Sequence, residues 1–322
     1  KVYKYHMKIL AVQNRMGIGD TVIFLPFIKA ISEKYNSPIS LLVKENSKAN
    51  QYLSETRYID KIIILERDQK NNNRHDGFFG SFNLVKDLKS HNFDKIFIFN
   101  SSLRFNLIAK FSKIPEIYQY PLFNKHKQHI VNTPKKFIKE KLDIDCFSDP
   151  EIQVDNKSII NASKKFLISK KEVNILLGIG GSGPTKRIPA YIFLKFMKDL
   201  IKQKKCKFFL ATGKNIDEQK ILNEILKSEL KNLCIPLDNL SIKEILPIIK
   251  NCDVSVCNDT GFSHLSAALG IETITLMADT PLIYGNYSSK MTPIIPDGEN
   301  DVSHNTLGKE RINPEKVLKK NN

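Results

Sequence analysis

The stretch that decides the fold is Cys252–Gly270, CDVSVCNDTGFSHLSAALG. Val254 and Val256 lie among small apolar neighbours, as residues of a buried parallel strand do. Residues 258–261, NDTG, then bring turn-forming chemistry, and apolar residues recur at helical spacing from Phe262 onward. The stretch therefore predicts a strand, a tight turn and the start of a helix.

A turn of this kind suits a phosphate group. Backbone N–H groups point outward at the start of the helix, and the helix dipole adds partial positive charge. The turn also carries a carboxylate, two hydroxyls and an imidazole, from Asp259, Thr260, Ser263 and His264. Asp259 or Ser263 taken alone is equally well explained as a helix cap. Taken together, these residue types favour a ligand site.

The run D-T-G-x-S-H-L-x-A-A-L at 259–269 resembles the donor-site signature of glycosyltransferase family nine, the ADP-heptose:lipopolysaccharide heptosyltransferases. The resemblance implies an α/β protein of the GT-B type, with two doubly wound, Rossmann-like domains facing across a cleft. It implies an inverting, metal-independent transfer of a heptose or similar sugar from an ADP-sugar donor to a lipopolysaccharide core or related glycan. No cofactor is implied, and Asp259, Thr260, Gly261 and His264 are expected to bind the donor.

Strand-like and helix-like segments alternate along the rest of the chain. Strand patterns occur at 7–12, 39–43, 62–65, 94–100, 116–120, 173–179, 207–212, 233–235 and 272–277. Helical patterns separate most of them, which indicates βαβ units and parallel sheets. The polar and basic residues 121–151 break this rhythm. We therefore expect an acceptor-binding domain with the catalytic Asp at 1–150 and a donor-binding domain at 151–322.

The first candidate for chemistry is NRMGIGDTVIFLP, residues 14–26. Gly17 and Gly19 permit a tight turn after the first strand, and Asp20 opens the following helix. From the residues alone, Asp20 is either the N-cap of that helix or a general base. The resembled family carries its catalytic Asp in R-x-G-x-G-D or a close variant. The resemblance therefore implies that Asp20 takes the proton of the acceptor hydroxyl.

A glycine-rich loop, GIGGSGPTKRIP, occupies residues 178–189. It is not a phosphate-binding Walker A loop, because Gly183 is followed by Pro184 and not by Lys. It resembles the family segment in which a Lys contacts the donor phosphates, and Lys186 holds that position. Considered alone, Lys186 and Arg187 are solvated loop cations. Ile188 stands where many family members have Trp, which leaves the shape of the donor pocket open.

Two further acidic pairs need interpretation. In ATGKNIDEQK, residues 211–220, the resemblance implies an acid against the nucleoside ribose, Glu218 first and Asp217 second. Either also fits as a solvated acid in the first turn of a helix. Asp143-Ile144-Asp145 is a D-x-D triplet, as in metal-dependent glycosyltransferases, but it lies in the interdomain stretch without a preceding strand. We interpret it as incidental and expect no metal site.

The chain is strongly basic, with 50 Lys and Arg against 34 Asp and Glu and a net charge of +16. Such an excess favours anionic partners. The run from Lys110 to Lys141 is rich in lysine, and it is explained by a solvated linker, a nucleic-acid patch or an acceptor-binding loop. No nucleic-acid-binding signature accompanies it, so nucleic acid is not expected. The resemblance implies an anionic glycolipid acceptor, for which the candidates are Lys125, Lys127, Lys135 and Lys136.

The five cysteines and the absence of a long apolar run set the expected location. The cysteine count is odd and no C-x-x-C occurs, so we expect a reducing compartment. No run reaches the roughly 20 apolar residues of a membrane helix. We expect a cytoplasmic protein with peripheral contact at the cytoplasmic face of the inner membrane. Residues 1–6 read as an extension if Met7 is the true start.

Two other functions stay open at this level. One is a nucleotide-sugar epimerase or hydrolase of the same two-domain fold. The other is a degenerate protein that binds a nucleotide sugar or a polyanion without catalysis. The joint presence of Asp20, Lys186 and His264 favours the glycosyltransferase.

Overall fold

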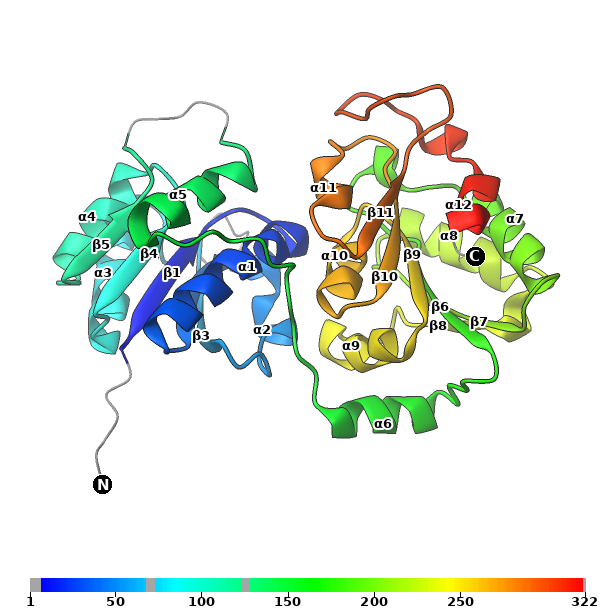
Figure 1. Ribbon diagram of the computed structural model, residues 1–322, viewed down its shortest axis with the longest axis horizontal. Coiled ribbons are helices and arrows are strands. Elements are labelled where there is room, and N and C mark those ends of the chain that lie inside the picture. The colour runs from blue at the N-terminus through cyan, green and yellow to red at the C-terminus, as the bar shows by residue number, and fades with distance from the viewer. Residues whose placement is uncertain (1–6, 68–72, 123–127, 321–322) are drawn as a thin grey trace. The chain divides into compact units, whose positions relative to one another are not determined.

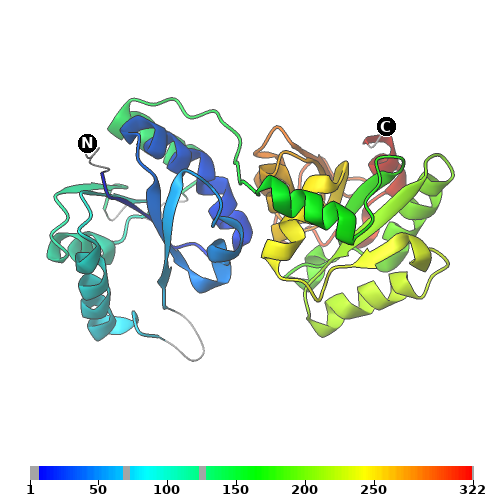
Figure 2. The same ribbon diagram turned by 90° about the horizontal axis from the view of Figure 1, so that it is seen from below.

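The computed structural model describes residues 7–67, 73–122 and 128–320. The chain divides into two compact units, Lys1–Pro150 and Glu151–Asn322. Each unit contains one parallel sheet with helices on both of its faces (Figures 1 and 2). The functions of the units as acceptor and donor domains stay predictions.

The sheet of the first unit has the strand order β3-β2-β1-β4-β5, and each ladder between its described residues is parallel. Its strands are β1 (Ile9–Gln13), β2 (Ile39–Lys44), β3 (Ile59–Leu65), β4 (Lys95–Ile98) and β5 (Glu116–Gln119). Its helices are α1 (Ile18–Tyr35), α2 (Ala49–Tyr52), α3 (Gly77–His91), α4 (Leu103–Phe111) and α5 (Asn132–Leu142). The strand order reverses between β1 and β4, so the sheet is doubly wound, as the sequence predicts.

The alternation of side chains along β4 shows how this sheet is covered. Ile96 and Ile98 belong to a core that also contains residues of α3 and α4. Phe97 points the other way, and its ring centroid lies 6.5 Å from that of Phe137 on α5. Successive strand residues face opposite sides of a sheet. Figure 2 accordingly shows α3 and α4 on one face and α1 and α5 on the other.

Helix α5 lies within residues 121–151, where the sequence suggested that the alternation breaks. The sequence patterns assigned no helix to Asn132–Leu142, and the structure adds this one. Phe137, Ile138 and Leu142 are buried, at the spacing of one helix face. The lysines between them masked this pattern, because their charges dominate the average polarity of the segment.

The sheet of the second unit has the order β11-β10-β9-β6-β7-β8. Its strands are β6 (Val173–Gly178), β7 (Cys206–Ala211), β8 (Cys234–Pro236), β9 (Val254–Asn258), β10 (Glu272–Leu276) and β11 (Met291–Ile294). Its helices are α6 (Asn156–Lys165), α7 (Ala190–Ile201), α8 (Ile216–Leu226), α9 (Ile242–Asn251), α10 (Gly261–Ala268), α11 (Ile283–Asn286) and α12 (Pro314–Lys320). Counted from β6, this is the 3-2-1-4-5-6 order of a dinucleotide-binding fold. The reversal falls between β6 and β9.

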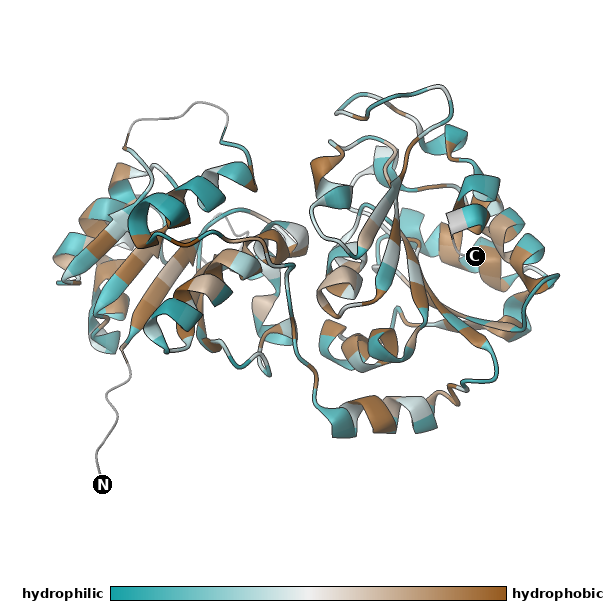
Figure 3. Cartoon of the chain, in the orientation of Figure 1, coloured by the Kyte–Doolittle hydropathy of each residue, from teal (hydrophilic) through white to brown (hydrophobic). Residues whose placement is uncertain are grey.

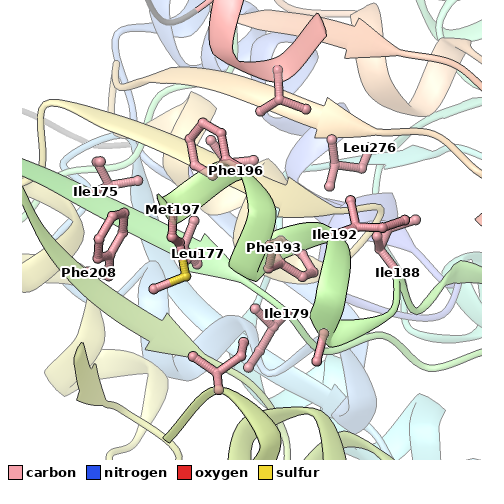
Figure 4. Packing of buried hydrophobic residues seen from close by; sticks show 14 of the residues in the cluster. Ile175, Leu177, Ile179, Ile188, Ile192, Phe193, Phe196, Met197, Phe208 and Leu276 are labelled. Atoms are coloured by element: carbon pink, nitrogen blue, oxygen red, sulfur yellow. The ribbon is translucent and has the colours of Figure 1, made fainter. Parts of the chain in front are cut away.

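One core cluster fixes α7 against the sheet of the second unit. Phe193, Phe196 and Met197 of α7 are buried with residues of β6 and β7 (Figure 4). Ile188, just before α7, belongs to the same cluster and has no exposed surface. The residue that stands in place of the family's Trp therefore packs in this core.

We expect Ile188→Ala to lower the free energy of unfolding by about 2–5 kcal/mol, because it leaves a cavity in a packed core. Tyr191→Ala is the matched control, since Tyr191 is exposed on the nearby helix α7; it should change stability by no more than about 0.5 kcal/mol. Denaturant unfolding of both variants gives the comparison. Equal stability of the two variants would contradict the buried position of Ile188.

Candidate functional site

The loops that follow β6 and β9 leave the second sheet from the same edge. The two strands are neighbours, with Gly178 opposite Cys257. Asn258, at the end of β9, donates two hydrogen bonds across to the glycine-rich loop, to the carbonyl oxygens of Ile179 (3.0 Å) and Gly180 (2.9 Å). These bonds hold the loop beside the DTG turn, at the point where the strand order reverses and α/β folds place their ligands.

Thr260 is the N-cap of α10. Its Oγ1 accepts a hydrogen bond from the backbone N–H of Phe262 at 3.2 Å, and Ser263 Oγ donates to the carbonyl of Thr260 at 2.7 Å. The alternative in which Asp259 or Ser263 caps this helix is therefore wrong. The carboxylate of Asp259 is directed to other partners.

Asp259 lies at the centre of a charged cluster. Its side chain is buried, and Oδ2 accepts a hydrogen bond from Lys186 Nζ at 2.7 Å. His264 Nε2 lies 3.8 Å from Oδ1. Burial alone would raise the pKa of Asp259, but the contacts with His264 and Lys186 outweigh it and hold the pKa well below its usual value. The carboxylate is therefore ionised throughout the neutral pH range.

Tyr287 extends this cluster, and sequence reasoning missed it. His264 Nδ1 and Tyr287 Oη lie at a hydrogen-bonding distance of 2.9 Å, and the two rings stack with centroids 5.6 Å apart. Tyr287 orients the imidazole from one side while Asp259 faces it from the other. Tyr287 follows α11, well outside the DTG motif, so no short sequence pattern could have identified it.

Glu218 and Arg187 brace the glycine-rich loop. Glu218 Oε1 accepts a hydrogen bond from the N–H of Gly181 at 2.7 Å, and Arg187 Nε donates to the carbonyl of Gly181 at 2.8 Å. A Cβ at Gly180 or Gly213 would collide with the Glu218 carboxylate in this position, so glycine at both positions leaves room for the bond to Gly181. Glu218 thus has a structural partner, and its role at the ribose stays a prediction.

Arg187 was considered a solvated loop cation, and the structure corrects this. The side chain is buried, and NH1 also pairs with Asp217 of α8 at 3.2 Å. Arg187 therefore connects the loop to α8. Lys186, the next residue back, is partly exposed, so its ammonium group is accessible from solvent.

In the first unit, Asp20 is the third residue of α1 and not its cap. The helix begins at Ile18, and its N-cap is Gly17, whose φ of 95° favours glycine. The N-cap alternative for Asp20 is therefore wrong. Gln13, buried at the end of β1, donates from Nε2 to the carbonyl of Asp20 at 2.9 Å and so fixes the first turn of the helix.

The loops around Asp20 again meet where the strand order reverses. Asn100, after β4, donates from Nδ2 to Asn14 Oδ1 at 3.2 Å. The turn that carries Asp20 thus lies at the carboxyl edge of the first sheet, the edge at which such folds bind ligands. The role of Asp20 as a base stays a prediction.

A pocket of about 470 Å³ opens at the same edge of the first sheet. Its lining includes Met16 after β1, Lys44 and Lys48 after β2, and Arg67 after β3. Glu45 is the acidic residue among its lining. The lining is predominantly basic and polar, which suits an anionic or polyhydroxylated ligand.

The lysines predicted to bind the acceptor have varied positions. Lys125 and Lys127 lie outside the described residues. Lys135 Nζ lies 4.0 Å from the ring centroid of Phe147, and Lys136 is paired with Glu140 at 3.6 Å. Neither contact tests the acceptor role, which stays a prediction.

The D-x-D triplet is engaged by a lysine: Lys139 Nζ lies 2.8 Å from both Asp143 Oδ1 and Asp145 Oδ2. Within the described ranges, no group of three or more His, Cys, Asp or Glu residues is arranged to hold a metal ion. No helix in that part of the chain has the length and apolar character needed to cross a bilayer.

Comparison with known proteins identifies the family. The sequence profile described as "Glycosyltransferase family 9 (heptosyltransferase)" matches residues 81–309. The chain belongs to glycosyltransferase family 9. It is thus related to a class of sugar-transferring enzymes, as the DTG and R-x-G-x-G-D motifs indicated.

Two curated relatives are named heptosyltransferases. Lipopolysaccharide heptosyltransferase 1 of Campylobacter coli is 28% identical over 171 residues, which cover 51% of this chain and 48% of that protein. Lipooligosaccharide heptosyltransferase 2 of Campylobacter jejuni (serotype O:6) is 28% identical over 276 residues, 82% of this chain and 79% of that protein. The first match spans only about half of its relative.

A solved structure supports the fold over the whole chain. An E. coli heptosyltransferase determined with ADP-2-deoxy-2-fluoro heptose has a TM-score of 0.68 at 14% identity, covering 98% of this chain and all of that one. The GT-B type of fold, with two Rossmann-like domains, is thereby confirmed.

The lowered pKa of Asp259 makes the stability of the protein depend on pH. We expect Asp259→Asn to lower the free energy of unfolding by about 1–3 kcal/mol at pH 7, because charge-assisted hydrogen bonds are lost. The folded-state pKa is lowered, so this contribution is complete above the unfolded-state value of about 4 and disappears as the pH falls towards the folded-state pKa. The melting temperatures of wild type and variant, measured by thermal unfolding, should therefore converge in acid.

Asp199→Asn is the matched control, since Asp199 pairs with Lys202 at the exposed surface of α7. That variant should differ little from wild type at any pH. A gap between wild type and Asp259→Asn that stays constant from pH 7 to about pH 2 would show that the carboxylate charge is not what stabilises the cluster.

Proposed function

We propose that this protein transfers a heptose or a similar sugar from an ADP-sugar to a lipopolysaccharide core or related glycan, with inversion and without a metal ion. The observation that carries the proposal is the cluster of Lys186, Asp259 and His264 at the N-terminus of α10. Family membership supplies the reaction class, and the ADP-sugar analogue bound by the E. coli heptosyltransferase supports the donor.

Lys186 provides the positive charge for the diphosphate. An ammonium group has three N–H donors, and Asp259 takes one of them, so donors remain for phosphate oxygens. Asp259 holds the flexible lysine in place before the donor arrives, which reduces the entropy lost on binding. The N–H groups at the start of α10 add positive potential beside it. These groups can neutralise a diphosphate, a function that a metal ion performs in other enzymes.

Asp20 is the proposed general base. The acceptor hydroxyl oxygen forms a bond to the anomeric carbon, and Asp20 takes its proton. The bond between that carbon and the diphosphate oxygen breaks, and ADP leaves with the electron pair. Attack from the face opposite the leaving group inverts the anomeric centre. Lys186 stabilises the charge that develops on the departing diphosphate.

The basic pocket of the first unit is the proposed place of the acceptor sugar. Lys44, Lys48 and Arg67 match the carboxylate and phosphate groups of an anionic glycan. The proposal also assigns acceptor binding to Lys125, Lys127, Lys135 and Lys136. An acceptor anchored in a lipid layer also requires peripheral contact with a membrane surface, and we include that contact in the proposal.

Lys186→Ala should weaken ADP binding about 10–100-fold, the value of a charge-assisted hydrogen bond to phosphate. Calorimetry with ADP, with and without EDTA, measures this, and the wild-type affinity should be the same in both buffers. Lys243→Ala, an exposed lysine on α9, is the control and should bind as wild type. Equal ADP affinities of all three proteins would show that Lys186 is a solvated loop cation without a role in binding. Loss of wild-type affinity in EDTA would overturn the metal-free mechanism.

Asp20→Asn should lower kcat about 10²–10⁴-fold, since the amide cannot accept the acceptor proton. ADP affinity should not change. Stability should fall by no more than about 1 kcal/mol, the size of the interaction between one charge in the first turn and the helix dipole. ADP release from ADP-heptose in the presence of acceptor glycan measures the rate.

Glu33→Gln is the matched control, because it removes one carboxylate from the exposed C-terminal end of the same helix. It should turn over as wild type does. Full activity of Asp20→Asn would exclude Asp20 as the base and with it the proposed mechanism.

A further inference from the structure

Helices α3 and α4 of the first unit expose an unusual number of large apolar side chains. On α3, Phe78, Phe79 and Phe82 have 74%, 81% and 57% of their surface exposed. On α4, Leu103, Leu107 and Phe111 are exposed at a spacing of four residues, along one side of the helix. We refer to these six side chains as the apolar surface.

The apolar surface is formed by neighbouring elements. The ring of Phe78 contacts those of Phe82 and Phe79, with centroids 5.0 and 6.0 Å apart. Arg104 of α4 donates from Nε to Ser81 Oγ of α3 at 2.9 Å, which holds the two helices side by side. Figure 3 shows hydrophobic segments recurring along both helices.

The side chains of the apolar surface are not needed to pack α3 and α4 against the sheet. Leu84 and Leu88 of α3 and Phe105 and Ile108 of α4 already fill the inward faces and are buried in the core. A helix that packs on a sheet normally has polar residues on its outward face. Grouped apolar residues there indicate a surface that another phase or molecule covers.

Most charges on α3 and α4 beside the apolar surface are positive, and the carboxylate of Asp76, the N-cap of α3, is paired with Arg67 at 3.2 Å. Lys86 and Lys89 follow Phe82 at four and seven residues, so they lie on the same side of α3. Lys110 precedes Phe111 on α4. Helix α4 has no acidic residue, and the acid of α3, Asp87, is paired with Arg74 and His75. Aromatic side chains beside lysines, without free carboxylates, match an anionic lipid surface.

We propose that the apolar surface docks this protein on an anionic lipid bilayer. The phenylalanine and leucine side chains enter the boundary between headgroups and acyl chains, and Lys86, Lys89 and Lys110 contact lipid phosphates. A second copy of the chain is the weaker candidate, because two equal basic faces would repel each other. The inference adds a binding surface to the proposed function, and it needs neither donor nor acceptor glycan.

Cosedimentation with vesicles tests the surface. Wild type should bind phosphatidylethanolamine–phosphatidylglycerol vesicles at least tenfold better than phosphatidylcholine vesicles. Replacing Phe78, Phe79 and Phe82 together by Ser should reduce binding at least tenfold. Lys86→Ser with Lys89→Ser should reduce it roughly 25-fold at low salt, since each lysine near such a surface contributes roughly a factor of five. The control replaces Leu167, Ile216 and Leu307 by Ser; these side chains are exposed in the second unit, and the control should bind vesicles as wild type does.

The absence of tryptophan from the chain allows a second readout. Phe79→Trp introduces a single reporter, whose emission should shift to the blue and be quenched by brominated lipids. Leu167→Trp, also on an exposed residue, should show neither effect. Circular dichroism and ADP affinity check that every variant is folded.

Three results would overturn the inference. One is unchanged vesicle binding by the triple Ser variant, and another is Phe79→Trp emission that brominated lipids do not quench. The third is a wild-type dimer in sedimentation that the triple Ser variant abolishes without any vesicle binding, which would assign the surface to a second copy. The vesicles contain no glycan acceptor, so failure here leaves the transferase proposal standing, and loss of turnover in Asp20→Asn leaves this inference standing.

Discussion

Parallel strand pairing is the constraint on which the rest of this structure depends. A parallel strand cannot be reached by a tight hairpin, so a crossover must carry the chain from the end of one strand to the start of the next. All crossovers then leave from one edge of the sheet. Where the strand order reverses, the two crossovers go to opposite faces and leave their loops side by side. The loops after β6 and β9, and those after β1 and β4, occupy these two positions.

The cluster around Asp259 shows how a buried charge is tolerated at such a position. An isolated carboxylate at the position of Asp259 would be strongly destabilised by loss of water. Lys186 and His264 compensate for it, and Tyr287 fixes the imidazole. The lysine comes from a different crossover than the aspartate, so the ion pair also joins the two loops. The polar groups are thereby arranged before any ligand binds, which is the condition for strong electrostatic stabilisation.

Much of the fold and part of the site could be predicted from local sequence patterns. The strand–turn–helix around Asp259 and the glycine-rich loop are short, contiguous patterns whose residue types have steric or electrostatic causes. Helix α5 was missed because lysines surround its buried face. Ile188 could not be assigned to the core from its position in a loop motif. Burial depends on contacts with distant strands, which a local pattern does not contain.

The sequence by itself determined the alternation of strands and helices, the two loops rich in glycine and polar residues, and the positive charge of the chain. These follow from the preferences of each residue for its own backbone and for water. Only the tertiary structure decided which side chains meet. It excluded Asp20 and Asp259 as helix caps, turned Arg187 inward, brought Tyr287 to His264 and left Phe79 facing solvent. The physical reason is that such contacts join residues far apart in the chain, and their positions follow from how the sheets and helices pack.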